Sequence, residues 1–485
     1  MHRHLALFIC TFLFCLGARG EIHVVNDGES IQASVRVAKA GDTIRVMPGT
    51  YEETVYIDKD DITLSGVIVN GEWPQLQGNN ELADGVLFSG SGVTVENLRI
   101  SNYRANGIMI QGGRNYAVRH NVIEHDTREM VYGIFPQFAK NGVVERNIVS
   151  GASDAAIYIT MTENTDALYN EVFDSVFGVE FENSDQILFE GNNVHDNVAG
   201  LLTARFPGLP VKTNGRYVIR NNFIHNNNEP NPYDSGLFEA IPQGTGIVLW
   251  AADDVEFEGN VIYNNDSAGL FVVTHDLWVE MGFVSPDPEI DAYPDNNKVF
   301  HNMFWANGNS PSGYMIDLYE KHGAEKGADI LVGEDGRGNC IFDASAVSSV
   351  NMKEWQTCDS DASTSDVLTV QLAEPVSGSP LSELPVEEQG RFVYQVICSG
   401  CHATETSMIG PPLNVVQALW ADDVEGMAEW IKNPTRRRED YPPMPPIDYL
   451  TDEVRLAVAR FIIEELPERT RRRREAAAAE TSSGL

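Results

Sequence analysis

Three stretches, Ala155-Ala-Ile-Tyr-Ile159, Phe177-Gly-Val-Glu-Phe181 and Ala199-Gly-Leu-Leu202, repeat one pattern in which a small residue opens an apolar strand. The small residues at positions 156, 178 and 200 are 22 residues apart. Periods of 20–50 residues are typical of solenoids and repeat arrays. Earlier and later copies of the pattern include Gly107, Gly133, Gly246 and Gly269.

A second strand of the form Asn-x-apolar lies between these copies. Examples are Asn121-Val-Ile123, Asn147-Ile-Val149, Asn260-Val-Ile262 and Asn302-Met-Phe304. Helical repeats need longer apolar faces with a period of 3.6 residues, and this region has none. The sequence therefore predicts a mainly β fold, a right-handed parallel β-helix solenoid over residues 21–358, with Asn side chains stacked at its corners. Roughly thirteen coils are expected, spaced ~4.8 Å apart.

Three segments interrupt the period and are rich in Pro, Gly, Asn and Asp: Arg205–Arg216, Asn226–Gly244 and Asp276–Asn297. Insertions in a solenoid usually form loops, often on the binding face. We expect these loops to wall a groove beside the strands.

The outer face of the repeated strand carries the first candidate site. Alternation along a strand points Glu180 and Glu182 outward together, with Tyr158 one coil earlier. Arg205 follows one coil later, and His275 follows the end of a later strand. Paired carboxylates can act as acid and base or bind a cation such as Ca²⁺. The alternative is a solvated acidic strand face.

The Asn-x-apolar strand has its own outward column, in which His195 and His225 fall on adjacent coils. Two stacked imidazoles can ligate a metal ion. The alternative is packing beneath a loop.

A different motif stands near the C-terminus, where Cys398-Ser-Gly-Cys401-His402 follows an apparent helix start at Val386. C-x-x-C-H is the attachment sequence of c-type haem, in which both thiols bind the porphyrin and the histidine binds iron. A C-x-x-C pair alone is also compatible with a redox or zinc site. The appended histidine, in an exported chain, favours one covalent haem c.

The motif is followed by Ile409-Gly-Pro-Pro-Leu413 and Tyr441-Pro-Pro-Met-Pro-Pro446. This layout resembles class I cytochrome c over about 80 residues. The resemblance implies a small all-α cytochrome c domain at residues 386–468, with Met444 as the second iron ligand and single-electron transfer as its role. Met408 and Met427 are weaker rivals. Residues 359–385 are expected to form a linker, and 469–485 a disordered tail.

The segments Gly151–Tyr158, Gly178–Ser184 and Phe206–Val211 resemble a family of exported bacterial parallel β-helix proteins of uncharacterised activity. Its members occur with, or joined to, c-type cytochromes. The wider, pectate-lyase-like superfamily also contains alginate epimerases and a maturation protein for nitrous oxide reductase. The epimerase motif D-P-H-D is missing here, as is a clear set of lyase calcium and arginine residues. Fold analogy therefore does not select a reaction.

The N-terminus predicts export. His2-Arg3-His4 precedes an apolar run from Leu5 to Leu16, and Ala18-Arg19-Gly20 offers a cleavage site, so residues 1–20 are expected to be a signal peptide. The run is too short to span a bilayer, and the expected location is periplasmic or secreted. In an oxidising compartment Cys340 and Cys358 are expected to form a disulfide bond; two buried free thiols are the alternative.

The net charge of −37 argues against nucleic acid and anionic membranes as partners. Our main hypothesis is a haem electron-transfer protein whose β-helix binds a substrate, an oligosaccharide for example, or a redox partner protein such as another c-type cytochrome. The alternatives are a carbohydrate-active lyase, epimerase or hydrolase with an accessory cytochrome, and a non-catalytic scaffold for maturation of a redox enzyme.

Overall fold

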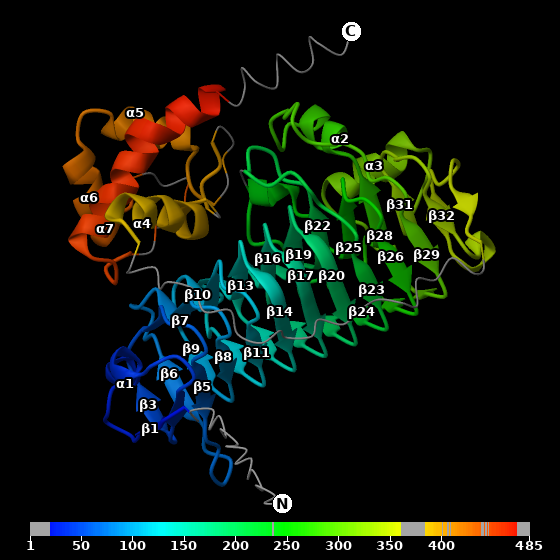
Figure 1. The fold of residues 1–485 in the computed structure, drawn as a ribbon. Coiled ribbons are helices and arrows are strands. Elements are labelled where there is room, and N and C mark those ends of the chain that lie inside the picture. The colour runs from blue at the N-terminus through cyan, green and yellow to red at the C-terminus, as the bar shows by residue number, and fades with distance from the viewer. Residues whose placement is uncertain are drawn as a thin grey trace, which may run out of the picture.

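The computed structural model describes residues 20–234, 237–359, 384–399, 401–404, 407, 409–437, 441, 444 and 446–472. Its N-terminal part is a rod of stacked coils, and a group of helices packs beside the N-terminal half of that rod (Figure 1). The predicted signal peptide, most of the predicted linker and most of the predicted tail lie outside the described residues.

Three parallel sheets form the rod, and each strand pairs with its equivalents in the coils before and after it. Sheet A consists of β1 (Ile22–Val25), β2 (Thr43–Val46), β5 (Thr63–Gly66), β8 (Thr94–Glu96), β11 (Ala117–Arg119), β14 (Lys140–Glu145), β17 (Glu163–Leu168), β20 (Asp185–Glu190), β23 (Val218–Arg220), β26 (Glu256–Glu258), β29 (Lys298–Phe300), β32 (Cys340–Ile341) and β34 (Gln356–Thr357). Sheet B consists of β3 (Gly49–Tyr51), β6 (Pro74–Gln77), β9 (Arg99–Ser101), β12 (Val122–Glu124), β15 (Ile148–Ser150), β18 (Glu171–Phe173), β21 (Asn193–His195), β24 (Phe223–His225), β27 (Val261–Tyr263) and β30 (Met303–Trp305). Sheet C consists of β4 (Val55–Ile57), β7 (Asp84–Phe88), β10 (Asn106–Gln111), β13 (Met130–Gln137), β16 (Ala152–Thr160), β19 (Phe177–Glu182), β22 (Ala199–Ala204), β25 (Thr245–Trp250), β28 (Ala268–Val273), β31 (Ala328–Val332) and β33 (Ser349–Val350). The predicted parallel β-helix is confirmed.

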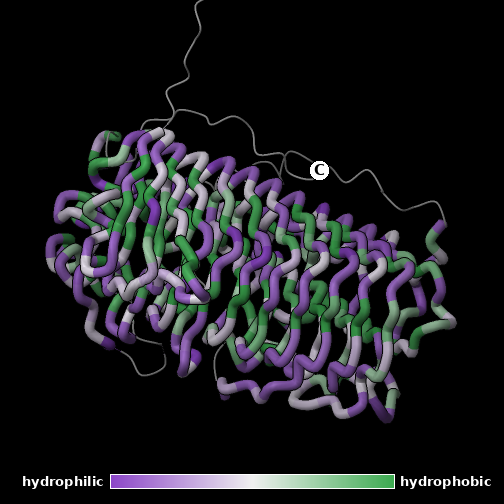
Figure 2. Tube along the Cα trace, turned by 90° about the horizontal axis from the view of Figure 1, so that it is seen from below, coloured by the Kyte–Doolittle hydropathy of each residue, from purple (hydrophilic) through white to green (hydrophobic). Residues whose placement is uncertain are grey.

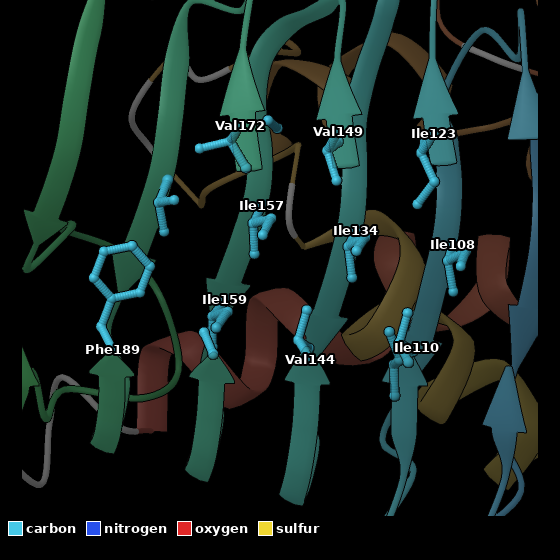
Figure 3. Packing of buried hydrophobic residues seen from close by; sticks show 14 of the residues in the cluster. Ile108, Ile110, Ile123, Ile134, Val144, Val149, Ile157, Ile159, Val172 and Phe189 are labelled. Atoms are coloured by element: carbon cyan, nitrogen blue, oxygen red, sulfur yellow. The ribbon is translucent and has the colours of Figure 1, made fainter. Parts of the chain in front are cut away.

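Stacked aliphatic side chains fill the interior of the rod. Ile108 pairs with Ile134, which pairs with Ile157, so one inward column runs through β10, β13 and β16 (Figure 3). Each fully buried Val or Ile contributes about 1.5–3 kcal/mol, and every coil adds several such residues. The hydropathy of the chain alternates accordingly around each coil (Figure 2).

A buried asparagine ladder marks the corner between sheets A and B. Each ladder side chain except the last donates from Nδ2 to Oδ1 of the asparagine one coil further on, at 2.8–3.1 Å. The residue before each of them has a positive φ, which turns the chain sharply at this corner. The ladder consists of Asn121, Asn147, Asn170, Asn192, Asn222, Asn260 and Asn302. The predicted stacking of corner asparagines is confirmed.

Both ends of the rod carry further structure. The helix α1 (Ile31–Val37) packs Ile31 and Val35 into the interior cluster beside the first coils. At the other end, the disulfide Cys340–Cys358 ties β32 to the residue after β34, as expected from the sequence. Two more helices, α2 (His275–Glu280) and α3 (Tyr314–Lys321), lie in the later coils.

The described residues of the C-terminal part contain four short α-helices around their own apolar cluster. The helix α4 (Val386–Val393) continues into a π-helical turn that ends at Cys398. It is followed by α5 (Leu413–Trp420), α6 (Val424–Lys432) and α7 (Asp452–Arg460). In the ranges that the structure describes, these and the other helices fall short of the length and hydropathy of a membrane span.

Candidate functional site

The outward column of sheet C is buried. Tyr158 pairs with Glu180 and Thr160 with Glu182, as the alternation predicted. Glu180 is 7% exposed and Glu182 is 2% exposed, because the inserted segments and the C-terminal helices cover this face. A solvated acidic strand face, the alternative raised above, is therefore wrong.

The covered face lines a partly open cavity, in which the centres of water-sized molecules have about 60 Å³. Sheet C provides its acidic wall through Asp154, Glu180 and Glu182. The opposite walls come from Trp278 on α2, Ile409 of the C-terminal part and the inserted segment around Ala240. The other lining side chains are aromatic or aliphatic, namely Tyr132, Tyr158, Phe177, Leu202, Phe206, Phe238, Ile241 and Trp250.

Burial makes all three carboxyl groups weak acids. It raises the pKa of Asp154 to about 7, and the nearby Tyr132 hydroxyl offsets this only in part. It raises the pKa of Glu182 to about 7, although the Tyr158 hydroxyl (2.5 Å) and the Thr160 hydroxyl (3.0 Å) both donate to its Oε1. Burial and the nearby charges of Asp154 and Glu182 raise the pKa of Glu180 well above its ordinary value. Near neutral pH this wall can therefore both donate and accept protons.

Aromatic rings line the rest of the cavity in stacked pairs. The rings of Tyr132 and Tyr158 lie 4.6 Å apart between centroids. Trp250 and Trp278 are nearly parallel, with centroids 4.8 Å apart and planes 8° apart. Both indole Nε1 groups are buried without a hydrogen-bond partner among the described residues. The cavity thus combines ionisable oxygens with aromatic faces, and Trp250 on β25 shares sheet C with the acidic wall.

The candidate haem-attachment residues Cys398, Cys401 and His402 are all described. Nδ1 of His402 lies 2.7 Å from the carbonyl oxygen of Pro411, a contact that orients the ring and leaves Nε2 for iron. Cys398 and Cys401 are not in disulfides, and burial raises the pKa of each thiol to about 12. Gly410 lies so close to the His402 ring that a Cβ there would meet Cε1 at 2.3 Å.

Two of the three candidate second ligands are described. Met444 is partly buried at the edge of the C-terminal cluster, next to a stretch that includes Ile447 and Tyr449. Met427 is 3% exposed inside the core on α6. Met408 lies outside the described residues. The side chains present fit a covalent haem held by Cys398 and Cys401, with His402 and a methionine as iron ligands.

This segment faces the β-helix and its cavity. Ala403 packs with Phe206 and Leu209 in the cluster on the outer face of sheet C. The charges of Asp154 and Glu182 add to the raised pKa of the Cys401 thiol, which places that thiol near the acidic wall. The Tyr449 hydroxyl lies beside the buried Asp84, whose pKa burial raises to about 6.

The family model for the right handed beta helix region matches residues 55–214 and 202–324, more than half of the chain. This chain belongs to the right-handed β-helix family. The matched region contains every β-helix residue of the cavity and ends before the C-terminal helices. No curated protein matches the chain.

Solved structures are similar to this right-handed β-helix protein at low identity. One is the A-module of the mannuronan C-5 epimerase AlgE6 from Azotobacter vinelandii, at 16% identity over 66% of this chain and 83% of that one, with a TM-score of 0.42. Another is a polygalacturonase from Erwinia carotovora, at 11% identity over 60% and 96%, with a TM-score of 0.40. A third is the pectate lyase Pel9A, at 12% identity over 70% and 78%, with a TM-score of 0.36.

Two candidate residues of this β-helix protein do not line the cavity. Arg205 is 4% exposed and is bonded to Asp253 (2.6 Å) and to two main-chain carbonyls. His275 begins α2, donates from Nε2 to the Ser285 carbonyl (3.1 Å) and stacks behind Trp250. Both support the wall around the cavity rather than its interior.

The histidine column of the β-helix is a stack, as its register predicted. His195 and His225 lie 5.2 Å apart between centroids, and their planes differ by 14°. The ring nitrogens of His195 are bonded to Asp196 and Glu171, and those of His225 to Asn193 and Asn226. In the described part of the chain no group of three or more His, Cys, Asp or Glu side chains is arranged to hold a metal ion. The geometry therefore favours packing.

Sequence reasoning missed Asp154 and the two tryptophans. The strand β16 has one residue more than β13 between the pairs Met130–Ala152 and Tyr132–Ala155. This bulge breaks the alternation and brings Asp154 to the acidic wall. Trp250 lies in the outward column that alternation predicts, so the sequence could have suggested it as a lining residue. Trp278 comes from an inserted segment without the repeat period, so nothing in the sequence places it at the cavity.

Proposed function

We propose that this protein is an exported c-type haem protein that carries single electrons, and that its β-helix cavity binds the small molecule with which it exchanges them. The observation that carries the proposal is the Cys398–His402 segment. It has the required thiols, a histidine oriented by Pro411, and a position against the cavity wall.

The residues have separate roles in this proposal. Cys398 and Cys401 attach the haem, and His402 and Met444 ligate its iron. A haem with His and Met ligands supplies a one-electron carrier without an open iron site. Glu182 and Asp154, whose pKa values lie near 7, exchange protons with the bound molecule. The stacked rings exclude water from it.

The location and the partner follow from the same proposal. An N-terminal signal peptide exports the chain to the periplasm or the medium, where c-type haem is attached. A redox partner protein, another c-type cytochrome for example, takes up or delivers the electrons. The net charge of −37 favours a partner with a basic docking surface.

The test is the variant Cys398→Ser with Cys401→Ser, produced by export in a host that matures c-type cytochromes. We expect wild type to retain haem on a denaturing gel and the variant to lose it completely, because the thioether bonds cannot form. The matched control, Cys340→Ser with Cys358→Ser, also removes two sulfurs and should keep its haem. Covalent haem in the first variant, or none in wild type, contradicts the proposal.

A second function is favoured by the acidic wall itself. Two glutamates with raised pKa values in an aromatic cavity can serve as acid and base in a carbohydrate lyase, epimerase or hydrolase. Under this function Glu180→Gln and Glu182→Gln each lower turnover of an oligosaccharide by at least about a hundredfold. Unchanged turnover in both variants excludes these residues as acid and base.

A further inference from the structure

The acidic wall of the cavity has no basic counterpart. Asp154, Glu180 and Glu182 converge on one space, and none of the described lining residues is Lys, Arg or His. Arg205, which the chain places one coil away, is turned to Asp253 instead. Buried carboxylates are normally paired with a cation or kept protonated. The described lining therefore offers no positive charge to the ionised form of these carboxyl groups.

Three buried polar groups in the wall also lack partners. Within the described residues the Glu180 carboxylate, 7% exposed, accepts no hydrogen bond, in contrast to Glu182 with two donors. The Nε1 groups of Trp250 and Trp278 are equally unpaired. Buried groups without partners are costly, and a bound water, ion or ligand can supply the missing partner. The ligand implied here supplies a positive charge to Glu180 and an oxygen acceptor to the indoles.

We propose that the cavity binds a small organic cation that also carries a hydroxyl or carbonyl oxygen, as in an amino alcohol or a quaternary ammonium alcohol. Aromatic faces attract such cations, and carboxylates neutralise them. An ammonium group held between Glu180 and the aromatic rings leaves its oxygen free to accept from an indole N–H. This inference deepens the proposed function and rests only on the part that makes the cavity a ligand site.

The closing experiment uses choline and its uncharged isostere dimethylbutanol, which have the same shape and differ by one charge. Both are titrated into the full-length exported protein by calorimetry at pH 8. We expect choline to bind at least about tenfold more tightly, as a cation–π contact and a carboxylate pair require. Glucose, a neutral polyol, should bind more weakly than choline.

Proton release gives an independent readout. Choline favours the ionised carboxylates, so its binding should release protons, seen as a heat that depends on the buffer, and its affinity should rise between pH 6 and pH 8. The Cys401 sulfur near the three carboxyls has no proton to release once it is bonded to haem. The other titratable groups that face them are Tyr132, Tyr158 and Tyr233, and burial raises the pKa of each. They stay protonated over this range, so the released protons come from the carboxyl groups.

Variants locate the binding. Glu180→Gln keeps the shape of the side chain. It should lower the affinity for choline about tenfold and leave the affinity for dimethylbutanol unchanged. Trp250→Phe keeps an aromatic ring but removes the N–H donor, so it should lower the affinity for both choline and dimethylbutanol. Exposed Glu81 supplies the control, Glu81→Gln, with no change expected.

Equal affinity for choline and dimethylbutanol, tighter binding of glucose, or no binding of either choline or ethanolamine overturns the inference. Haem content is measured on the same preparations. Haem present without cation binding overturns only this inference, whereas cation binding without haem overturns only the electron-transfer function.

Discussion

Glu180 and Glu182 share a strand with two of the most deeply buried residues of the rod. Val179 and Phe181 point inward and are fully buried, while the two glutamates between and after them point to the cavity. The four residues from Val179 to Glu182 thus supply both part of the solenoid core and part of the acidic wall. Because the wall is covered, its carboxyl groups are held away from water, and their pKa values rise.

The raised pKa of Glu182 predicts a pH-dependent stability. The folded protein holds a proton on Glu182 up to about pH 7, whereas the unfolded chain loses it near the ordinary value of 4.5. The free energy of unfolding therefore falls as pH rises between these values. Glu182→Gln has no proton to lose, so between pH 5 and pH 8 it should gain about 1–3 kcal/mol relative to wild type. Urea denaturation of wild type and variant at pH 5 and pH 8 measures the free energies of unfolding.

The control for this experiment is Glu81→Gln, which changes an exposed carboxylate. Its stability should run parallel to wild type over the whole range. Parallel curves for Glu182→Gln as well would show that Glu182 is already ionised in the folded protein at pH 5.

For single residues, the sequence predicted on which side of a strand a side chain lies, but not whether that side chain is buried. Period-two alternation placed Tyr158, Glu180 and Glu182 correctly in the outward column, because the strand pairing is regular there. It left open whether that column meets solvent, since the covering segments have no period of their own. Arg205 was predicted beside the glutamates, but it lies beyond the end of β22, where alternation no longer fixes direction.

At the scale of strands and turns, the corner asparagines connect one coil of the rod to the next by hydrogen bonds. Asn170 accepts from the main-chain N–H and Nδ2 of Asn147 and donates to the Val144 carbonyl and to Asn192. Every one of these groups is buried. The ladder therefore holds consecutive coils in register where the chain turns.

Asn170→Ala should lower the free energy of unfolding by about 2–4 kcal/mol, because several buried donors and acceptors lose their partner together. Chemical denaturation followed by circular dichroism measures the change. Asn309→Ala is the matched control: this exposed side chain makes one bond, to the Ala306 carbonyl, and its loss should cost less than about 1 kcal/mol. Equal losses at both positions would contradict a structural role for the ladder.

The strands of the rod were predictable from the 22-residue period and the recurring Asn and Gly residues. The helices α1, α2 and α3 were not, since each has eight residues or fewer and falls within or between coils. So short a segment shows less than three turns of helical period. Even a correctly predicted strand can mislead at one position. In β16 one extra residue interrupts the alternation, so the sequence did not predict that Asp154 lies at the acidic wall.

On the scale of the whole molecule, the C-terminal helices contact the side of the rod and not its end. Phe392 of α4 approaches Gly112, where a Cβ would meet its ring at 2.9 Å. Ala403 lies against Gly208, and Ile409 closes the cavity. The cavity is complete only when the two parts are in contact.

Phe392→Asp should separate the two parts, because a charged side chain would replace a ring at their contact, at a cost of about 2 kcal/mol or more. Small-angle scattering should show a larger radius of gyration, with the unfolding of the β-helix unchanged. Leu419→Asp on α5, where the leucine is 57% exposed, introduces the same charge away from the contact and should leave the radius unaltered. An unaltered radius of gyration for both variants would show that other contacts hold the C-terminal helices against the rod.

The alternation within each strand of sheet C also bears on how such a protein changes over generations. Inward residues such as Val179 and Phe181 are constrained by the coils on either side, whereas outward residues such as Glu180 and Glu182 take no part in the packing of the rod interior. Substitutions in the outward column can therefore accumulate without loss of the scaffold. A lineage can acquire a new ligand by altering every second residue of a few strands, while the residues between them preserve the ancestral fold.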